Sequence, residues 1–372
     1  MQRNNDLDVL RGILLIIITI NHVGGPLSRL AFQPMGFVTS AEGFIFLSGN
    51  VLGFTFGKRL LEGNKISFKT VLRRSFKIYK YHILILAASL LPFIITYPNS
   101  SRWQSSELLP FFEQTVPAVI SYLLLLFQPH SLDILPMYVI YIPIGFIALT
   151  CFANQKAKYV FAASILFWFI GQSEFSYALI HTSNPFRTSS FDLLSWQLLF
   201  ILGCFFGYSR SIGHQIILKN KSNLIVCLTL FFAFAFVRYG DGLNGEITET
   251  LRNFSDKSDL QIFRLVNFLV IAYLIDYLIS TNYFPNFKAA AFLGRHSLQV
   301  FSFQTILLYY YLPFRGDIYE IGSIAKLTVQ CVFVLLLFIP AFIHQYLLNK
   351  RLYIKSQKIQ ASEKLMKYQS QD

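Results

Sequence analysis

The sequence is poor in charged side chains. Only 14% of its 372 residues are Asp, Glu, Lys or Arg, whereas 54% are hydrophobic and 17% are aromatic. Soluble domains usually carry about 25% charged residues, so this composition argues against a soluble fold. The apolar stretches recur from one end of the chain to the other, which is typical of a polytopic α-helical membrane protein.

Cysteine is scarce as well. The four cysteines lie inside apolar runs, and none has a partner at a metal-ligand spacing. We therefore expect small core residues, and no metal site, at Cys151, Cys204, Cys227 and Cys331.

Acidic residues are few compared with basic ones. The chain has 19 Asp and Glu against 32 Lys and Arg, which gives a net charge of +13. In a soluble protein such an excess would suggest nucleic-acid binding. Here the basic residues gather in short gaps between apolar runs, as membrane topology signals do. We therefore expect no nucleic-acid partner.

The long apolar runs define the fold class. A bilayer core needs about 20 apolar residues per helix, and shorter runs suffice inside a bundle. The sequence predicts an all-α integral membrane protein with about ten transmembrane helices, forming one domain over residues 1–346 with a basic tail over 347–372. The predicted spans are residues 9–28, 37–57, 76–97, 132–153, 158–174, 195–209, 222–239, 262–280, 292–313 and 322–346.

The basic clusters predict the orientation, because Lys and Arg accumulate in short cytoplasmic loops. With ten spans every cluster falls on one face if both termini are cytoplasmic. The clusters lie at residues 58–77, 156–158, 210–221, 288–295 and 350–355. Residues 108–127 are apolar enough to suggest a further span, but that span would move the 156–158 cluster to the other face. We interpret 108–127 as a re-entrant or interfacial helix on the outer side.

The first two spans contain ionisable residues. From Arg11 to His22 is eleven positions, which on an α-helix places both side chains within about 20° of one face and about 16 Å apart along the axis. Glu42 in the second span lies at a matching depth when both are counted from their cytoplasmic ends. Charged groups inside a bilayer usually mark a substrate path, a proton relay or a catalytic site. A hydrogen-bonded pair that only fixes helix packing is the alternative.

An imidazole held by a carboxylate can act as a general base that turns a hydroxyl into a nucleophile. Such a hydroxyl could attack an acyl thioester. Arg11, below His22 on the same face, could then hold the anionic end or the phosphates of an acyl donor from the cytoplasm. The glycines at positions 49, 53 and 57 indicate close helix packing.

Six sequence blocks carry a family resemblance. They are LDVLRGILLIIITINH, AEGFIFLSGNVLGFTFGK, RRSFKIYKYH, LDILPMYVIYIP, SWQLLFILGCFFGY and FLGRHSLQVFSF. In order and over most of the chain, they resemble the OpgC family of inner-membrane succinyltransferases. That family is similar to the larger acyltransferase 3 group of membrane acyltransferases.

The resemblance implies the activity. It implies a multi-pass acyltransferase domain of the bacterial inner membrane that moves succinyl from cytoplasmic succinyl-CoA to hydroxyls of osmoregulated periplasmic glucans. Succinyl-CoA is then a co-substrate, and no tightly bound cofactor is expected. Carried over residue by residue, the resemblance implies His22 as general base, Glu42 as its partner acid, and donor contacts at Arg11, Arg73 and Arg74.

Two further groups of residues are candidates for substrate binding. Arg295 and His296 open a span on the cytoplasmic side, where helix N–H groups also favour an anion; an ordinary interfacial arginine is the alternative. On the outer rim, acids, amides and aromatic rings suit a sugar, although aromatic residues also gather at membrane interfaces. The rim candidates for the acceptor are His130, Asp133, Trp196 and Gln197.

The sequence is also compatible with other functions. A proton-coupled transporter could also use buried Arg, His and Glu, but such transporters usually have two similar halves, and no internal repeat is evident here. An acyltransferase with the same mechanism could instead move another group, such as acetyl, to lipopolysaccharide or another envelope glycan. Transfer by way of an acyl-histidine, and a homodimer, also stay open.

The topology is testable with reporter fusions. Because basic loops alternate with loops of mixed charge, fusions at Asn154 and Lys355 should report a cytoplasmic position. Fusions at Ser100 and Gly245 should report a periplasmic position. A periplasmic signal from Lys355 would contradict the predicted number of spans.

Overall fold

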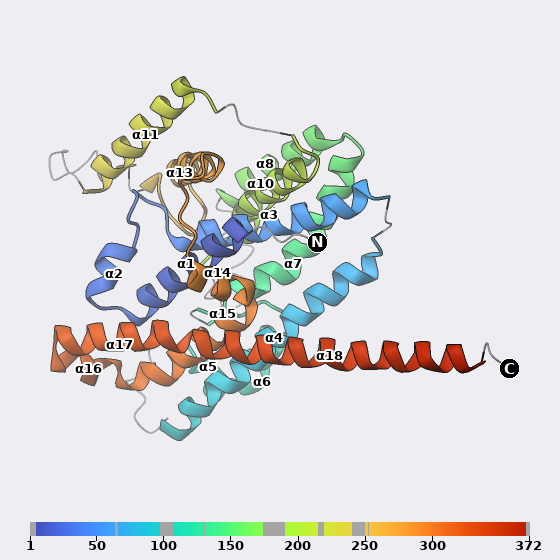
Figure 1. Ribbon diagram of the computed structural model, residues 1–372. Coiled ribbons are helices and arrows are strands. Elements are labelled where there is room, and N and C mark those ends of the chain that lie inside the picture. Colours follow the sequence, from blue (N-terminus) through green and yellow to red (C-terminus); the bar gives the residue numbers. More distant parts are fainter. Residues whose placement is uncertain are drawn as a thin grey trace.

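The computed structural model describes residues 5–63, 66–96, 107–129, 131–173, 190–214, 219–239, 250–251 and 253–369. These residues form helices joined by turns, and no strand occurs among them. The amino-terminal half contains α1 (Asn5–Val23), α2 (Pro26–Ala31), α3 (Ser40–Leu61), α4 (Phe68–Thr96), α5 (Pro110–Glu113), α6 (Thr115–Leu123), α7 (Ile134–Ala153) and α8 (Ala157–Gly171). The remainder contains α10 (Leu193–Ser211), α11 (Lys221–Tyr239), α13 (Ile262–Ser280), α14 (Lys288–Arg295), α15 (Ser297–Tyr311), η2 (Leu312–Phe314), α16 (Arg315–Ile321), α17 (Ser323–Leu336) and α18 (Phe338–Gln369) (Figure 1).

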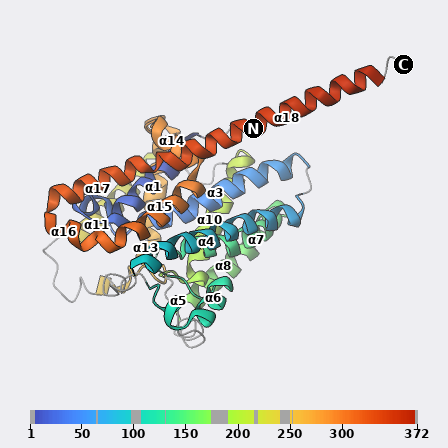
Figure 2. The same ribbon diagram turned by 90° about the horizontal axis from the view of Figure 1, so that it is seen from below.

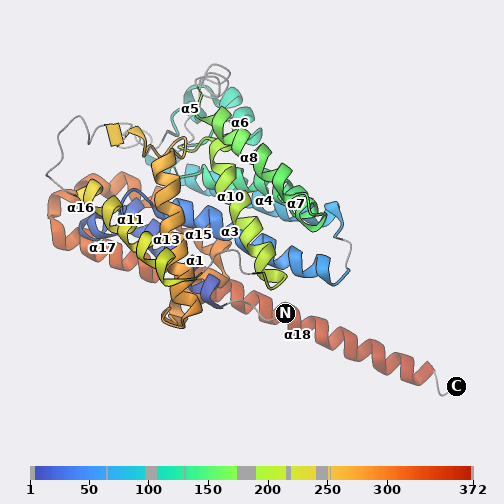
Figure 3. The same ribbon diagram turned by 90° about the horizontal axis from the view of Figure 1, so that it is seen from above.

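Six stretches of the described chain are long and apolar enough to cross a membrane. The all-helical, multi-pass class expected from the sequence is therefore confirmed at this level. The six are Phe68–Thr96, Ile134–Ala153, Leu193–Ser211, Lys221–Tyr239, Ile262–Ser280 and Ser323–Gln357. In α11, no residue is buried. This helix lies at the upper left edge of the bundle in Figure 1 and in front of the other helices in Figure 3, which is seen from above, as expected for a helix surrounded by lipid.

Several predicted spans differ from the helices. The span predicted at 9–28 ends at Val23, because Gly24 and Gly25 adopt positive φ before α2. The span predicted at 292–313 breaks at His296 into α14 and α15. Residues 347–369, predicted as a tail, continue α18 as helix, which projects beyond the bundle in Figures 1 and 2.

The segment predicted to be re-entrant forms two short helices. At 9 residues, α6 is about 14 Å long, which is too short for a hydrocarbon core of about 30 Å. It packs against the middle of α4, where the Tyr122 ring stacks on His82 with centroids 4.1 Å apart. The segment is therefore not a transmembrane span.

The most extensive contact between two helices of the described chain is that of α3 with α10. A Cβ on Gly49 would lie 2.2 Å from the carbonyl oxygen of Phe200, and one on Gly53 would lie 2.1 Å from that of Cys204. The two backbones thus touch, as the glycine repeat in the sequence predicted. Cys204 is buried here, but the exposed Cys331 shows that the core position expected for that cysteine is wrong.

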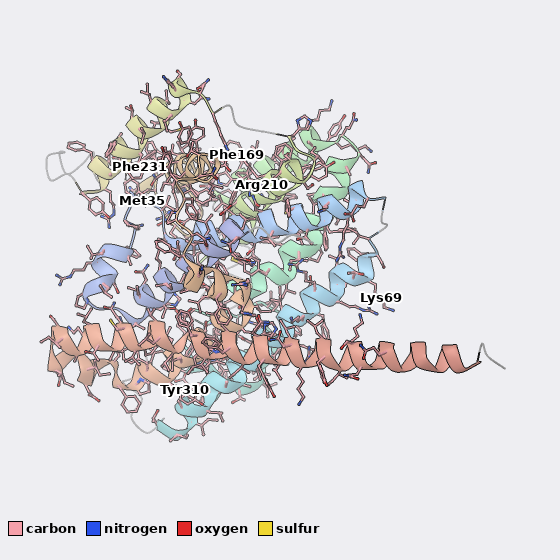
Figure 4. All side chains as sticks on the ribbon, in the orientation of Figure 1. Met35, Lys69, Phe169, Arg210, Phe231 and Tyr310 are labelled. Atoms are coloured by element: carbon pink, nitrogen blue, oxygen red, sulfur yellow. The ribbon has the colours of Figure 1, made fainter. Side chains whose placement is uncertain are left out.

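The two ends of the bundle can be recognised in Figure 4. Met35 and Tyr310 lie on the left in that view, and Lys69 lies on the right, where α18 projects. Met35 precedes α3, Tyr310 lies in the last turn of α15, and Lys69 lies in the first turn of α4. In this view the start of α4 therefore lies opposite the start of α3 and the end of α15.

Candidate active site

A basic cavity of about 560 Å³ lies among α1, α3, α4, α7, α15 and α18. Its basic wall contains Arg11, Arg74, Lys77 and Arg295, with one carboxylate, Asp8, beside them. The excess of positive charge suits a ligand with several negative charges, and guanidinium groups suit phosphate or carboxylate in particular. The cavity thus unites three of the residues predicted to bind the donor.

Local packing explains which basic residues reach this cavity. Arg74 and Lys77 are three positions apart on α4 and therefore share a face. Arg295 is brought close to Arg11 because α14 lies against α1, where a Cβ on Gly12 would lie 1.9 Å from the carbonyl oxygen of Ala290. Arg73 and Arg74 are both exposed, but only Arg74 lines the cavity.

His296 is linked to the cavity through a second histidine. It lies between α14 and α15, is buried, and its Nδ1 is 2.8 Å from Nδ1 of His344 on α18. His344 lines the cavity, whereas His296 does not. His296, a predicted donor contact, therefore lies behind the cavity wall, in contact with His344.

His22 lies in the last turn of α1, about 16 Å along the helix from Arg11, and does not line the cavity. Its Nδ1 is 2.9 Å from Nε2 of Gln304 on α15. The chain segment that follows α1 is held in place by the buried side chain of Gln330 on α17. Its Oε1 accepts from the Leu27 backbone N–H at 3.1 Å, and its Nε2 donates to Ser28 Oγ at 3.0 Å. The last turn of α1, which carries the imidazole, is therefore followed by a segment whose position is fixed by hydrogen bonds.

Glu42 is fully buried in the first turn of α3. Its Oε2 accepts from the Thr39 backbone N–H at 3.0 Å and from the Thr39 hydroxyl at 2.6 Å, which forms a capping box. Its Oε1 accepts from Arg264 Nη1 of α13 at 2.6 Å. The hydrogen bonds of Glu42 thus go to Thr39 and Arg264, and its predicted role toward His22 stays a prediction.

The register of α1 and α3 explains this arrangement. Gly43, next to Glu42, packs against Leu14, which precedes His22 by eight residues, or about 12 Å along the helix. The count from the helix ends suggested that Glu42 and His22 lie at the same depth. The contact of Gly43 with Leu14 shows that they do not. His22 lies closer to the carboxyl end of α1 than the level at which Glu42 packs.

The outer-rim candidates have internal contacts. Trp196 is fully buried and donates from Nε1 to the carbonyl oxygens of Lys257 and Ser258, each at 3.0 Å. Gln197 accepts from Ser164 Oγ and donates to the Ser164 carbonyl, each at 2.7 Å, which joins α10 to α8. Asp133 is buried before α7 and accepts from the Ser190 backbone N–H at 3.2 Å. His130 lies outside the described residues. Acceptor binding by these four residues stays a prediction.

Three residues near the predicted site were not predicted from the sequence: Gln304, Arg264 and His344. Arg264 and His344 are each a single ionisable residue within an apolar run. An ionisable residue in such a run usually has a function or a charged partner. Gln304 has no such signal, because a neutral amide in a transmembrane helix often serves only helix packing. Lys77 was predicted only as a member of the cytoplasmic basic patch.

The buried ion pair of Glu42 and Arg264 predicts a large effect on stability. Arg264→Leu leaves a carboxylate buried without its cation and should cost about 3–5 kcal/mol. Glu42→Gln should destabilise by a similar mechanism, and the double variant should lose less than the sum of both. The measurement is a thermal-unfolding double-mutant cycle in detergent.

The control for this cycle is Arg210→Leu. Arg210 pairs with Asp276 at 3.0 Å, but both side chains are 31% exposed, and Lys219 also contacts Asp276 at 2.9 Å. Its loss should cost at most about 1 kcal/mol. Equal losses for Arg210→Leu and Arg264→Leu would contradict the assignment of a special role to the buried pair.

Comparisons with known proteins identify the family. No curated protein and no solved structure matches this chain. The family model described as OpgC protein matches residues 3–347, which include α1, the basic cavity and the helices that carry His22 and Gln304. The match extends over nearly the whole chain, so this protein belongs to the OpgC family.

Proposed function

We propose that this protein is a transmembrane O-acyltransferase that moves succinyl from cytoplasmic succinyl-CoA to hydroxyls of osmoregulated periplasmic glucans. In this proposal it crosses the bacterial inner membrane about ten times, with both termini in the cytoplasm. The observation that carries the proposal is the family match over residues 3–347, together with a basic cavity whose Arg11 shares one helix with His22.

The basic cavity supports binding of the donor. Four cationic side chains surround it and only one carboxylate lies beside them, so a polyanionic acyl-CoA is favoured over a neutral sugar. Two of the three arginines of the wall also lie near aromatic rings. Arg74 Cζ is 6.0 Å from the Phe56 ring centroid, and Arg295 Cζ is 5.9 Å from that of Phe292. Such contacts restrain a guanidinium group in a fixed position for phosphate.

His22 is the proposed general base. Its imidazole removes the proton from a glucan hydroxyl as the hydroxyl oxygen attacks the thioester carbonyl. The tetrahedral intermediate then collapses, the carbon–sulfur bond breaks, and the imidazolium returns the proton to the leaving CoA thiolate. The products are a succinyl ester and free CoA, and no external reductant or oxidant is needed.

Glu42 has a supporting role in this proposal. Its carboxylate is held by Arg264 and caps α3, so it fixes the outer end of α3 and contributes to the local field instead of bonding the imidazole directly. For the acceptor, we propose direct contact by Asp133. Trp196 and Gln197 use their polar groups inside the protein, which supports a role for them in shaping the rim.

Removal of the base should abolish transfer. His22→Ala and His22→Gln should lose about 10²- to 10⁴-fold in turnover, as is usual when a general base is lost. Turnover of succinyl-CoA with glucan should be measured on purified protein at matched folded concentration. His214→Ala, in the turn after α10, is the matched control and should keep normal turnover.

Near-normal turnover of both His22 variants would refute the catalytic assignment. The substrate is tested in cells by mass spectrometry of periplasmic glucans, with and without the gene. Loss of a substituent that adds negative charge supports succinyl transfer. Loss of a neutral substituent, or unchanged glucans, would contradict it.

The two adjacent arginines of α4 should differ in donor binding. Arg74 lines the cavity and Arg73 does not, so Arg74→Ala should weaken CoA binding by about 10- to 100-fold, the equivalent of one charge-assisted hydrogen bond of about 1.5–3 kcal/mol. Arg73→Ala should bind nearly as wild type. Titration calorimetry with CoA is the measurement, and equal losses for both variants would place the donor elsewhere.

A further inference from the structure

The basic cavity ends at a floor of aromatic rings. Phe44 of α3, Tyr138 of α7 and Phe301 of α15 all line it, and they are 4%, 5% and 2% exposed. The Phe44 and Phe301 rings stack with centroids 5.8 Å apart at 25°, and Phe44 lies 6.2 Å from the Tyr138 ring. Three helices therefore contribute one contiguous aromatic layer.

His22 lies on the far side of this layer. Phe301 lines the cavity, and Gln304, which contacts His22, follows it by one turn on the same face of α15. On α1, Arg11 lines the cavity, but Leu15, one turn farther, does not and is fully buried. The cavity that suits the donor and the proposed base are thus separated by packed apolar side chains.

Hydrogen bonds hold part of the layer in position. The Tyr138 hydroxyl donates to the Phe44 carbonyl oxygen at 3.2 Å. Ser48 Oγ lies 2.8 Å from the same carbonyl oxygen and 3.2 Å from the Tyr138 hydroxyl. Phe44 and Tyr138 are therefore tied to each other, and Phe301 meets Phe44 from a different helix through ring stacking.

We propose that Phe44, Tyr138 and Phe301 form an aromatic gate between the donor cavity and His22, and that the gate selects the acyl group by size. The acyl end of the thioester must pass this layer to meet the acceptor, whereas the phosphates remain at the basic wall. A tightly packed layer admits a short acyl chain and keeps water from the thioester. The proposed selection of the acyl group rests on the proposed function. The proposed barrier between the cavity and His22 does not depend on that function.

The barrier is tested by cysteine labelling, which needs no enzymatic activity. In a variant without the four native cysteines, Ser48→Cys and Leu15→Cys report the cavity and the region beyond the gate. A small charged methanethiosulfonate reagent should label Ser48→Cys in purified protein and leave Leu15→Cys unlabelled. Adding Phe301→Ala should accelerate labelling of Leu15→Cys at least about tenfold, since a barrier of packed atoms is removed.

A matched control separates the gate from general loosening. Ile142 lines the same cavity, is 5% exposed, and lies one turn from Tyr138 on α7. Ile142→Ala should leave Leu15→Cys protected. The barrier is overturned if Leu15→Cys reacts equally with and without Phe301, or if Ile142→Ala exposes it as much as Phe301→Ala does.

Selectivity is tested with acyl-CoA donors of increasing length. Phe301→Ala should raise the ratio of kcat/KM for adipoyl-CoA to that for succinyl-CoA by about tenfold, the scale of a gain of one or two methylene positions in an apolar site. It should also increase acyl-CoA hydrolysis without acceptor. Phe301→Leu, which keeps an apolar side chain, should lie between Phe301→Ala and wild type and provides a milder variant if Phe301→Ala does not fold.

The outcomes distinguish this inference from the proposed function. An unchanged ratio in Phe301→Ala and Phe301→Leu, with transfer intact, overturns selection by the gate and leaves the acyltransferase proposal standing. If the His22 variants remain active, the catalytic proposal fails, but the protection of Leu15→Cys still decides whether the aromatic layer is a barrier.

Discussion

The free-energy cost of burying an ionisable group inside a membrane-embedded bundle constrains this structure. The chain offsets that cost in two ways. Glu42 and Arg264, at 0% and 4% side-chain exposure, neutralise each other at 2.6 Å, and Thr39 supplies further hydrogen bonds. The cations around Arg11 instead share a cavity, in which water or an anionic ligand can solvate them. The first arrangement joins α3 to α13, and the second leaves a cavity whose charge suits an anion.

Backbone contact makes the remaining bundle rigid enough to hold these groups. Lipid provides no hydrophobic drive between helices, so helices that must stay together do so through close approach of small residues. Gly49 and Gly53 bring α3 onto α10, and Gly12 brings α1 onto α14. Phe44 on α3 and Arg11 on α1 are therefore carried by helices with fixed neighbours. The gate is formed where these fixed helices meet α7 and α15.

Part of the candidate site was predictable because its signals are local in sequence. An arginine and a histidine on one helical face, an adjacent basic run and a glycine repeat each follow from spacing, and the structure unites Arg11, Arg74 and Arg295 at one cavity. The side of α4 on which each arginine lies was not predictable from basic composition, and Arg73 is directed elsewhere. The six long apolar stretches were also visible as hydropathy, whereas the breaks at Gly24 and His296 depend on tertiary packing.

The partners of buried polar groups were beyond sequence reasoning. Glu42 meets an arginine 222 residues later in the chain, and His22 meets a glutamine 282 residues away. Such pairings depend on the register between helices, which a one-turn shift changes by about 5 Å. A depth counted from predicted helix ends contains the position error of both helices. This explains why Glu42 and His22 were expected at the same depth.

The placement of Arg11 and His22 on one continuous helix has a consequence for the length of any donor. Because α1 has no break between them, the helical rise acts as a ruler that fixes their separation at about 16 Å. A donor anchored by its phosphates near Arg11 can present its thioester to His22 only if a flexible arm of that reach joins the two ends. A simple short thioester would carry the same reactive group and still fall short of the base.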